Sequence, residues 1–251
     1  MDQKTRHVEA GTPQPDPKYH IDILPKGPYL VYGAPPLHQE ILETNEENIP
    51  WKYIKGSEFS TQKEPTALCR CGHSKNNPYC DGTHTSCQWD SELTADNRPL
   101  LENAKRYDGP SVQLADNEDY CVHARVCMAK GGVWDLTEAS DDPQNRDLAI
   151  HETIHCPSGR LKLWDKKEEK FIEPPLEPAL GLIEDPQERC NGPLWVKGGI
   201  PINGADGTLY EQRNRVTLCR CGNSGNKPHC DGSHVVSHFQ DHLDICHRTE
   251  D

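Results

Sequence analysis

The sequence predicts an α+β protein in which two small β-rich modules flank an inserted α+β domain. A motif of three cysteines and one histidine occurs twice, far apart, and each copy follows a short apolar run that begins with Gly-Pro. Between the copies lie three other cysteines and a helical pattern, and 251 residues suffice for two or three small domains. We expect a flexible tail at 1–18, a first module at 19–87, an inserted domain at 88–186, a second module at 187–240 and a tail at 241–251.

The composition argues against a large apolar interior. Only 33% of the residues are hydrophobic, the formal charge is −13, and 21 prolines and 19 glycines interrupt regular structure. Such a chain leans toward disorder unless something else stabilises it. Its 12 cysteines indicate that bound metal replaces the missing core.

The same features limit compartment and partners. The first residues, MDQKTRHVEA, lack the apolar run of a secretory signal, and no apolar run approaches the ~20 residues that span a bilayer. We therefore expect a cytoplasmic protein, in which cysteines bind metal more often than they form disulfides. The acidic balance argues against nucleic acid or an anionic membrane as partner. We also expect a monomer whose tandem modules are related by a pseudo-twofold axis.

A short apolar run precedes each cysteine motif. GPYLVYGAPPL (27–37) recurs as GPLWVKGGIPI (192–202), and each run is closed by turn residues, as a strand is. In the second copy, Asp206-Gly207 predicts a tight hairpin turn and a strand that leads to Cys219. The first copy has a longer, acidic connection, HQEILETNEENIPWKYIKG (38–56).

The two motifs, CRCGHSKNNPYCDGTH and CRCGNSGNKPHCDGSH, bring sulfur and nitrogen ligands together. Cys-x-Cys places two thiolates on one side of an extended segment. A cysteine and a histidine four residues apart share a helix face, and the aspartate between them is suited to cap that helix. Spacing alone leaves open a structural zinc site and a diiron cluster with two ligands on each iron. The candidate ligands are Cys69, Cys71, Cys80 and His84 in the first motif and Cys219, Cys221, Cys230 and His234 in the second.

The motifs resemble the CDGSH iron–sulfur family, the mitoNEET type. Its pattern also has a serine or threonine and a proline at intermediate positions, which Ser74 with Pro78 and Ser224 with Pro228 occupy here. The resemblance implies a 2Fe-2S cluster in each motif, held by three cysteines and one histidine beneath a β-rich cap. MitoNEET itself is a membrane-anchored dimer, whereas this chain resembles the family's monomers with two motifs. The insert departs from a simple side-by-side arrangement.

A third cysteine set lies in the inserted segment. Bacterial ferredoxins bind a cubane with Cys-x2-Cys-x2-Cys and a distant Cys-Pro. CVHARVC matches the outer positions with Cys121 and Cys127, has Ala124 at the centre, and is followed by Cys156-Pro157. The segment resembles single-cluster ferredoxins and the divergent mono-cluster domain often found beside CDGSH motifs. Three thiolates predict a 3Fe-4S cluster; the alternatives are a 4Fe-4S cluster with His123 or Cys190 as fourth ligand, and three buried thiols without a cluster.

The rest of the insert predicts a helix and a linker. Asp142 is suited to cap a helix that has Pro143 in its first turn, and Pro157 with Gly159 ends it after Cys156. Its HETIH matches the zinc-protease signature His-Glu-x-x-His, but the helix stops at once and no third ligand follows at the usual spacing. Leu161 to Trp164 is expected to be a strand, and the proline-rich segment 171–186 a linker.

These observations predict an iron–sulfur protein that transfers single electrons to an unidentified redox partner. We expect His84 and His234 on the exposed side of their clusters, where protonation competes with iron and couples the potential to pH. The alternative is a store that donates 2Fe-2S clusters to apo-proteins, and a third possibility is a zinc-bound interaction module. An enzyme is not expected, because no catalytic acid–base set is visible. Cys87, Cys190 and Cys246 remain as thiols outside the ligand sets.

Overall fold

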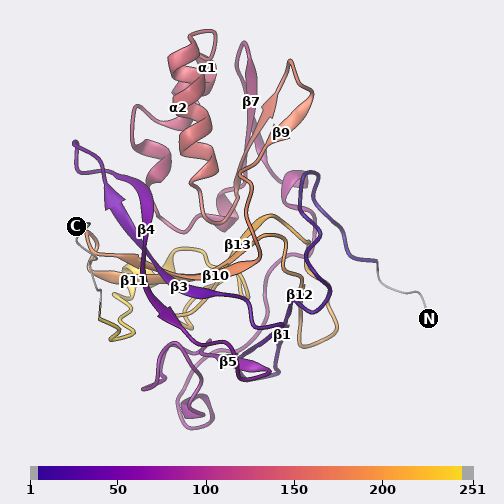
Figure 1. Ribbon diagram of the computed structural model, residues 1–251, viewed down its shortest axis with the longest axis vertical. Coiled ribbons are helices and arrows are strands. Elements are labelled where there is room, and N and C mark those ends of the chain that lie inside the picture. The colour runs from indigo at the N-terminus through magenta and orange to yellow at the C-terminus, as the bar shows by residue number, and fades with distance from the viewer. Residues whose placement is uncertain (1–4, 245–251) are drawn as a thin grey trace.

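The computed structural model describes residues 5–244, which form three β-sheets and a few short helices (Figure 1). The thiol of Cys246 and most of the expected C-terminal tail lie outside this range. The α+β class is confirmed. Two sheets belong to the duplicated modules, and the third belongs to the insert. The module strands are β1 (His20–Ile23), β2 (Tyr29–Tyr32), β3 (Leu37–Thr44), β4 (Pro50–Phe59), β5 (Thr66–Leu68), β10 (Ala179–Asp185), β11 (Cys190–Lys197), β12 (Ile202–Asn203) and β13 (Arg215–Leu218).

The two modules exchange strands. The first sheet has the order β12-β1-β2-β5 and the second has the order β13-β11-β10-β3-β4. Thus β12 of the second module pairs in parallel with β1, and β3 of the first pairs in parallel with β10. The registers correspond, because Ile202 lies opposite Ile21 and Leu37 lies opposite Leu180. Leu37 and Ile202 are the last residues of the two sequence repeats, so each repeat ends by crossing into the other's sheet.

This exchange builds one hydrophobic core from two small modules. Neither copy has enough apolar residues for a core of its own, and shared burial lowers the free energy of both. Along β11, Leu194 and Val196 face this core, whereas Trp195 faces away from it toward the insert. Fully or nearly buried core members include Ile21, Tyr29, Val31, Leu37, Leu68, Leu180, Leu182, Leu194, Val196, Val216 and Leu218.

The two cysteine motifs meet where the modules join. Gly72 and Gly222 follow Cys71 and Cys221, have φ of 79° and 81°, and lie against each other's motif. A methyl group on Gly72 would overlap the Cys221 carbonyl, and one on Gly222 would overlap the Cys71 carbonyl. Only glycine allows this reciprocal approach. The two motifs therefore contact each other reciprocally, in spite of the insert between the modules.

The insert is a small α+β domain on the outer face of the five-stranded sheet (Figure 1). Its sheet has the order β6-β7-β8-β9, and two helices cover one side with a separate core around Leu114 and Leu163. The expected strand at Leu161 to Trp164 is confirmed as β8. Its elements are β6 (Lys105–Asp108), β7 (Val112–Asp116), α1 (Val133–Glu138), α2 (Pro143–Ile154), β8 (Leu161–Asp165) and β9 (Lys170–Ile172), with 3-10 turns η2 (Leu100–Glu102), η3 (Glu118–Tyr120) and η4 (Val126–Met128).

Helix α2 starts as predicted. The Asp142 carboxylate accepts a hydrogen bond from Gln144 N at 2.7 Å, and Pro143 is the first helical residue. The helix ends at Ile154, slightly before the expected end at Cys156. The segment expected to be a linker up to residue 186 is only partly a linker, because Ala179–Asp185 forms β10 between β11 and β3. The second module therefore begins earlier than residue 187. Leu180 and Leu182 are buried in the shared core, which is what makes a strand favourable there.

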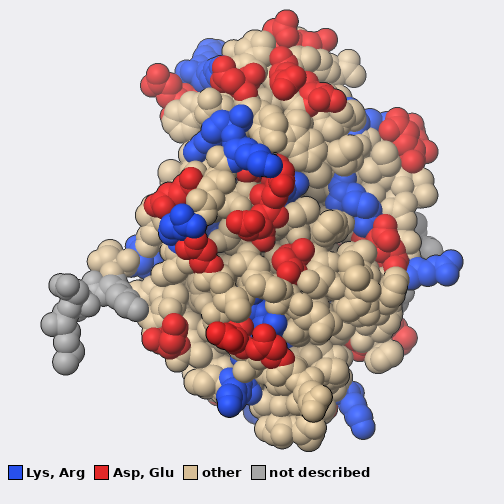
Figure 2. Space-filling model, turned by 180° about the vertical axis from the view of Figure 1, so that it is seen from behind, with Lys and Arg blue, Asp and Glu red and all other residues tan. Residues whose placement is uncertain are grey.

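The long acidic connection of the first module forms β3 and β4, which reach the insert. The Trp51 ring stacks on His151 of α2 with centroids 3.6 Å apart, and Asn45 donates a hydrogen bond to the Ala129 carbonyl at 2.9 Å. On the face shown in Figure 2, acidic and basic side chains are interspersed without a broad basic patch. No helix within residues 5–244 is both long and apolar enough to cross a membrane.

Candidate metal centres

The first motif gathers its four predicted ligands as two close pairs. The sulfurs of Cys69 and Cys71 are 3.7 Å apart, and the Cys80 sulfur is 3.3 Å from His84 Nδ1. Backbone bonds hold the two ends of the loop together, because Cys69 N donates to the Pro78 carbonyl and Cys80 N to the Ala67 carbonyl, both at 2.9 Å. The residues between the pairs thus form a closed loop that brings both pairs to one end of β5.

The second motif repeats this geometry. The sulfurs of Cys219 and Cys221 are 3.8 Å apart, and the Cys230 sulfur is 3.4 Å from His234 Nδ1. Two backbone N–H groups point at these sulfurs, from Asn223 to Cys221 at 3.5 Å and from Gly232 to Cys230 at 3.4 Å. Among residues 5–244, no three Cys, His, Asp or Glu side chains lie close enough together to hold a single metal ion.

The polar residues of the motifs close the loops. The Ser74 hydroxyl donates to the Tyr79 carbonyl at 2.6 Å, and Ser224 makes the equivalent bond to His229 at 2.7 Å. The Asp231 carboxylate accepts from Gly225 N at 2.7 Å and from Ser233 N at 3.0 Å, as Asp81 does in the first motif. These bonds lock the loop against the turn that carries the histidine.

One local prediction was wrong. We expected each cysteine–histidine pair to share a helix face, but the short helices η1 (Thr83–Thr85) and α3 (Ser233–Val236) begin after the cysteine. Glycine, not aspartate, is the residue that precedes each helix, and Gly82 and Gly232 both have φ of 88°. The pair meets because this left-handed turn folds the chain back, a conformation that glycine adopts without strain.

The two motifs differ in exposure, which also corrects an expectation. We expected both histidines on the exposed side; His84 is half-buried, but His234 is only 4% exposed. Burial lowers the pKa of His234 to about 4. The insert contributes to the difference, because the His123 ring lies against Gly232, where a methyl group would overlap it, while the space around Gly82 is open.

The three central cysteines come together at the base of the insert. Cys121 follows η3, Cys127 lies in η4, and Cys156 follows α2. Burial, followed by the nearby Cys156 thiolate, raises the pKa of Cys127 to about 12. Burial also raises the pKa of Cys121, and Cys156 and Asp116 raise it further. Ala124, where a ferredoxin has its central cysteine, is 8% exposed and packs in a hydrophobic cluster with Val122 and Cys230.

Comparison with known families agrees with these three sites. The model of the iron-binding zinc finger of CDGSH type matches residues 26–85 and 191–235, and the model of the divergent 4Fe-4S mono-cluster domain matches residues 107–166. The chain therefore consists of two CDGSH-type domains around a divergent mono-cluster domain. It binds iron–sulfur clusters. No curated protein matches it significantly, and no solved structure does.

The donor sets fit the clusters that these domains imply. Cysteine sulfur with one imidazole is a combination that iron–sulfur proteins use, and backbone N–H groups directed at sulfur stabilise a thiolate and its cluster. Each CDGSH loop presents its donors as two close pairs. The central domain presents three thiolates within electrostatic reach of one another.

Arg160 is a central-site residue that sequence reasoning missed. Its guanidinium donates to the Asp116 carboxylate at 2.7 Å and is 7% exposed. Burial alone lowers the pKa of Arg160, but the Cys156 and Cys121 thiolates outweigh burial and raise it. Its positive charge acts on all three central cysteines. Its position four residues after Cys156 carries no motif that would have singled it out.

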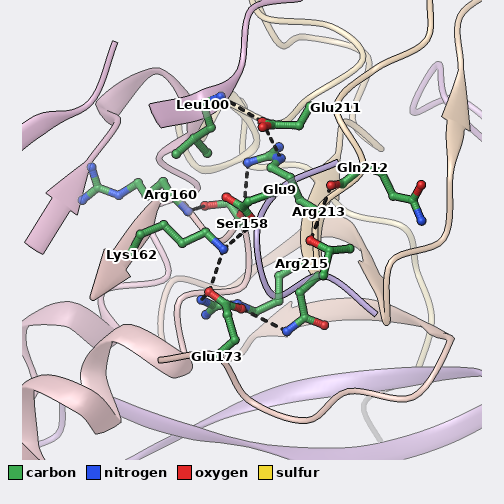
Figure 3. Close-up of polar contacts among 12 residues, drawn as sticks. Glu9, Leu100, Ser158, Arg160, Lys162, Glu173, Glu211, Gln212, Arg213 and Arg215 are labelled. Atoms are coloured by element: carbon green, nitrogen blue, oxygen red, sulfur yellow. Dashed lines mark hydrogen bonds and ion pairs between the residues drawn. The ribbon is translucent and has the colours of Figure 1, made fainter. Parts of the chain in front are cut away.

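A buried ion network ties the Cys156 loop to the second CDGSH domain (Figure 3). Arg215 of β13 donates to the carbonyls of Thr153, Ile154 and Cys156 at 2.8–2.9 Å. It also pairs with Glu173 at 3.0 Å. Burial opposes ionisation of Glu173, but Arg215 and Lys162 prevail and lower its pKa to about 2. The network is completed by Lys162, which contacts Glu173 at 2.6 Å and Glu9 at 2.5 Å.

The two candidate fourth ligands have different surroundings. His123 has φ of 55°, and its ring is directed at Gly232 of the second CDGSH loop. Cys190 begins β11 and is 3% exposed; burial, followed by Asp185, raises the pKa of its thiol to about 11. Its other charged neighbours include Arg125 and Glu188.

The HETIH segment has a packing role in the structure. The rings of His151 and His155 stack with centroids 4.0 Å apart, and His151 Nε2 lies 3.0 Å from the Trp51 carbonyl. Glu152 is fully buried and accepts a hydrogen bond from Lys130 N at 2.7 Å. His151 thus holds β4 against α2, and His155 stacks on His151.

Proposed function

We propose that this protein is a one-electron relay with a 2Fe-2S cluster in each CDGSH loop and a 3Fe-4S cluster in the central domain. The ligands are Cys69, Cys71, Cys80 and His84; Cys219, Cys221, Cys230 and His234; and Cys121, Cys127 and Cys156. When bound, the clusters supply the redox chemistry, and the chain fixes their order, surroundings and access.

The observation that carries the proposal is the contact between successive ligand loops. Gly72 and Gly222 bring the backbones of Cys71 and Cys221 together, and the Cys121 loop lies on the second motif through His123 and Gly232. Cys121 is also close enough to raise the pKa of the Cys230 thiol, after burial, Cys219 and Asp231. Electron transfer weakens steeply with distance, so contiguous loops favour a relay in the order first CDGSH, second CDGSH, central site.

The pairs of donors support a two-iron cluster in each CDGSH loop. In the central domain, Ala124 at the missing ligand position supports three thiolates and therefore three irons. Iron and sulfide analysis of anaerobically purified protein tests both assignments. About seven irons and an EPR signal in the oxidised state are expected, whereas about eight irons and a signal only after reduction would indicate a central 4Fe-4S cluster.

A second candidate is cluster donation to an apo-protein, and the exposure of the first motif favours it. Cys80 lies in an open cleft of about 320 Å³ that is also lined by Lys63, Asn76 and Tyr79. A partner can reach this loop directly. Mixing the loaded protein with an apo-acceptor separates the two functions, because a donor loses iron to the acceptor while a relay changes only its oxidation state.

A further inference from the structure

Two polar donors are buried without partners where the five-stranded sheet meets the central cysteine loop. The Tyr53 hydroxyl, on β4, and the Trp195 indole N–H, on β11, have no accessible surface and no hydrogen-bond partner among the described residues. Their rings pack together, with centroids 4.9 Å apart at 50°. Both belong to the hydrophobic cluster that contains Val122 and Ala124 of the loop.

Unpartnered buried donors are costly. Leaving a buried hydroxyl unsatisfied costs about 1–3 kcal/mol, so most such groups have an acceptor. The Tyr53 hydroxyl stays neutral and keeps its proton to donate, since burial, and next Cys156, raise its pKa well above the usual value. The Trp195 N–H has no acceptor capacity at all. The Tyr53 hydroxyl and the Trp195 N–H are therefore two buried donors that still need an acceptor.

The missing acceptor is identified by its surroundings. The Tyr53 ring packs against Val122 and Ala124 of the cysteine loop, and β4 packs directly on η4, which carries Cys127. After burial, Cys156 is the neighbouring group that most raises the pKa of Tyr53. The polar groups that a cluster brings to this position are sulfurs, which accept hydrogen bonds from hydroxyl and indole groups. We propose that the Tyr53 hydroxyl donates a hydrogen bond to a sulfur of the central cluster, and that this contact from a CDGSH domain raises the cluster's reduction potential.

The sign of the effect follows from charge. Reduction adds an electron to the cluster, and a hydrogen bond to sulfur stabilises the more negative state. A charge-assisted bond is stronger than a neutral one. The inference rests on the proposed function only in requiring a cluster at Cys121, Cys127 and Cys156. Tyr53 is thus a tuning residue on a different domain from the ligands.

The test is the Tyr53→Phe variant, which removes one oxygen and keeps the ring. We expect the oxidised-to-reduced ratio of the central cluster, at the wild-type midpoint, to rise about tenfold, equivalent to a fall of about 59 mV for one electron. EPR-monitored redox titration measures it, and the two CDGSH clusters are expected to keep their potentials. The matched control is Tyr32→Phe, a half-buried tyrosine on β2 of the first sheet, which should leave all three potentials unchanged.

A second measurement covers the case in which Tyr53→Phe does not assemble. In wild-type protein exchanged into D2O, deuterium ENDOR should detect an exchangeable deuteron strongly coupled to the central cluster. Its absence would overturn the inference, and so would an unchanged central potential in a fully loaded Tyr53→Phe protein. If wild-type protein contains no central cluster by iron and sulfide analysis, it is the proposed function that fails.

Discussion

The contact between the central domain and the second CDGSH loop can be tested with two equivalent glycines. Gly82 and Gly232 have the same φ of 88°, so an alanine at either position carries the same left-handed strain of about 1–2 kcal/mol. Their surroundings differ. An added Cβ at Gly82 meets nothing within 4 Å, whereas at Gly232 it overlaps the His123 ring.

The overlap gives the expected magnitude. Forcing an extra methyl group into a packed contact costs about 1–3 kcal/mol, which Gly232→Ala should show and Gly82→Ala should not. That free energy opposes docking of the Cys121–Cys127 loop. It corresponds to about a 5- to 150-fold larger population of the undocked loop.

Native-state hydrogen exchange of the loop amides measures this population. Exchange at residues 121–127 should be faster in Gly232→Ala by that factor and unchanged in Gly82→Ala. Combining Gly232→Ala with His123→Ala should restore slow exchange, because the overlap is removed. Equal exchange in the two single variants would refute the docking contact, and so would a double variant no slower than Gly232→Ala.

Three further outcomes are expected. When a neutral iron chelator is added, the first CDGSH cluster should be lost before the second, because His84 is half-buried whereas His234 is only 4% exposed. EPR spectra recorded during the loss show which cluster signal disappears first. Arg215→Met should destabilise the docked Cys156 loop by about 3–5 kcal/mol, because Glu173 loses an ion-pair partner and three carbonyls lose their hydrogen-bond donor. Iron analysis should show that the central cluster is lost first. Arg160→Gln should lower the central potential by at least about 59 mV, because a positive charge facing the three thiolates is removed, while Arg160→Lys should retain most of it.

One variant serves as a control, and each outcome has a result that would contradict it. Arg106→Met, on the exposed strand β6, should change stability by no more than about 0.5 kcal/mol. Simultaneous loss of both CDGSH clusters to chelator would contradict the difference in exposure. Retention of the central cluster in Arg215→Met would show that the carbonyl contacts do not hold the ligand loop. If the central cluster of Arg160→Gln keeps the wild-type reduction potential, Arg160 does not influence that potential.

Much of the candidate site could be read from local spacing. Two ligands separated by one residue in an extended segment lie near each other in almost any fold, and a closed loop brings the second pair to the first. That is why the pairs in both motifs appear at 3.3–3.8 Å, even though the helix assumed for Cys80 and His84 is absent. The start of α2 was likewise predictable, because capping by Asp142 involves only its immediate neighbours.

Other features depend on residues far apart in the chain. The strand at Ala179–Asp185 was expected to belong to a linker because prolines flank it at 174, 175, 178 and 186, and it becomes a strand only because β3 and β11 lie on either side of it. Arg160 and Tyr53 carry no motif, and their roles follow from what the fold places beside them. Sequence patterns describe neighbours along the chain, not neighbours across a domain interface.

By itself, the sequence determined which residues are able to bind metal, that the set is duplicated, and that a third set of thiols stands between the copies. These are properties of short segments, in which covalent geometry limits how far ligands can separate. The tertiary structure decided which motif is covered, which loops touch and which side chains face the central cysteines. Those outcomes arise from strand exchange between the modules and burial of the insert on the outer face of their sheet, where the free energy comes from packing distant residues together.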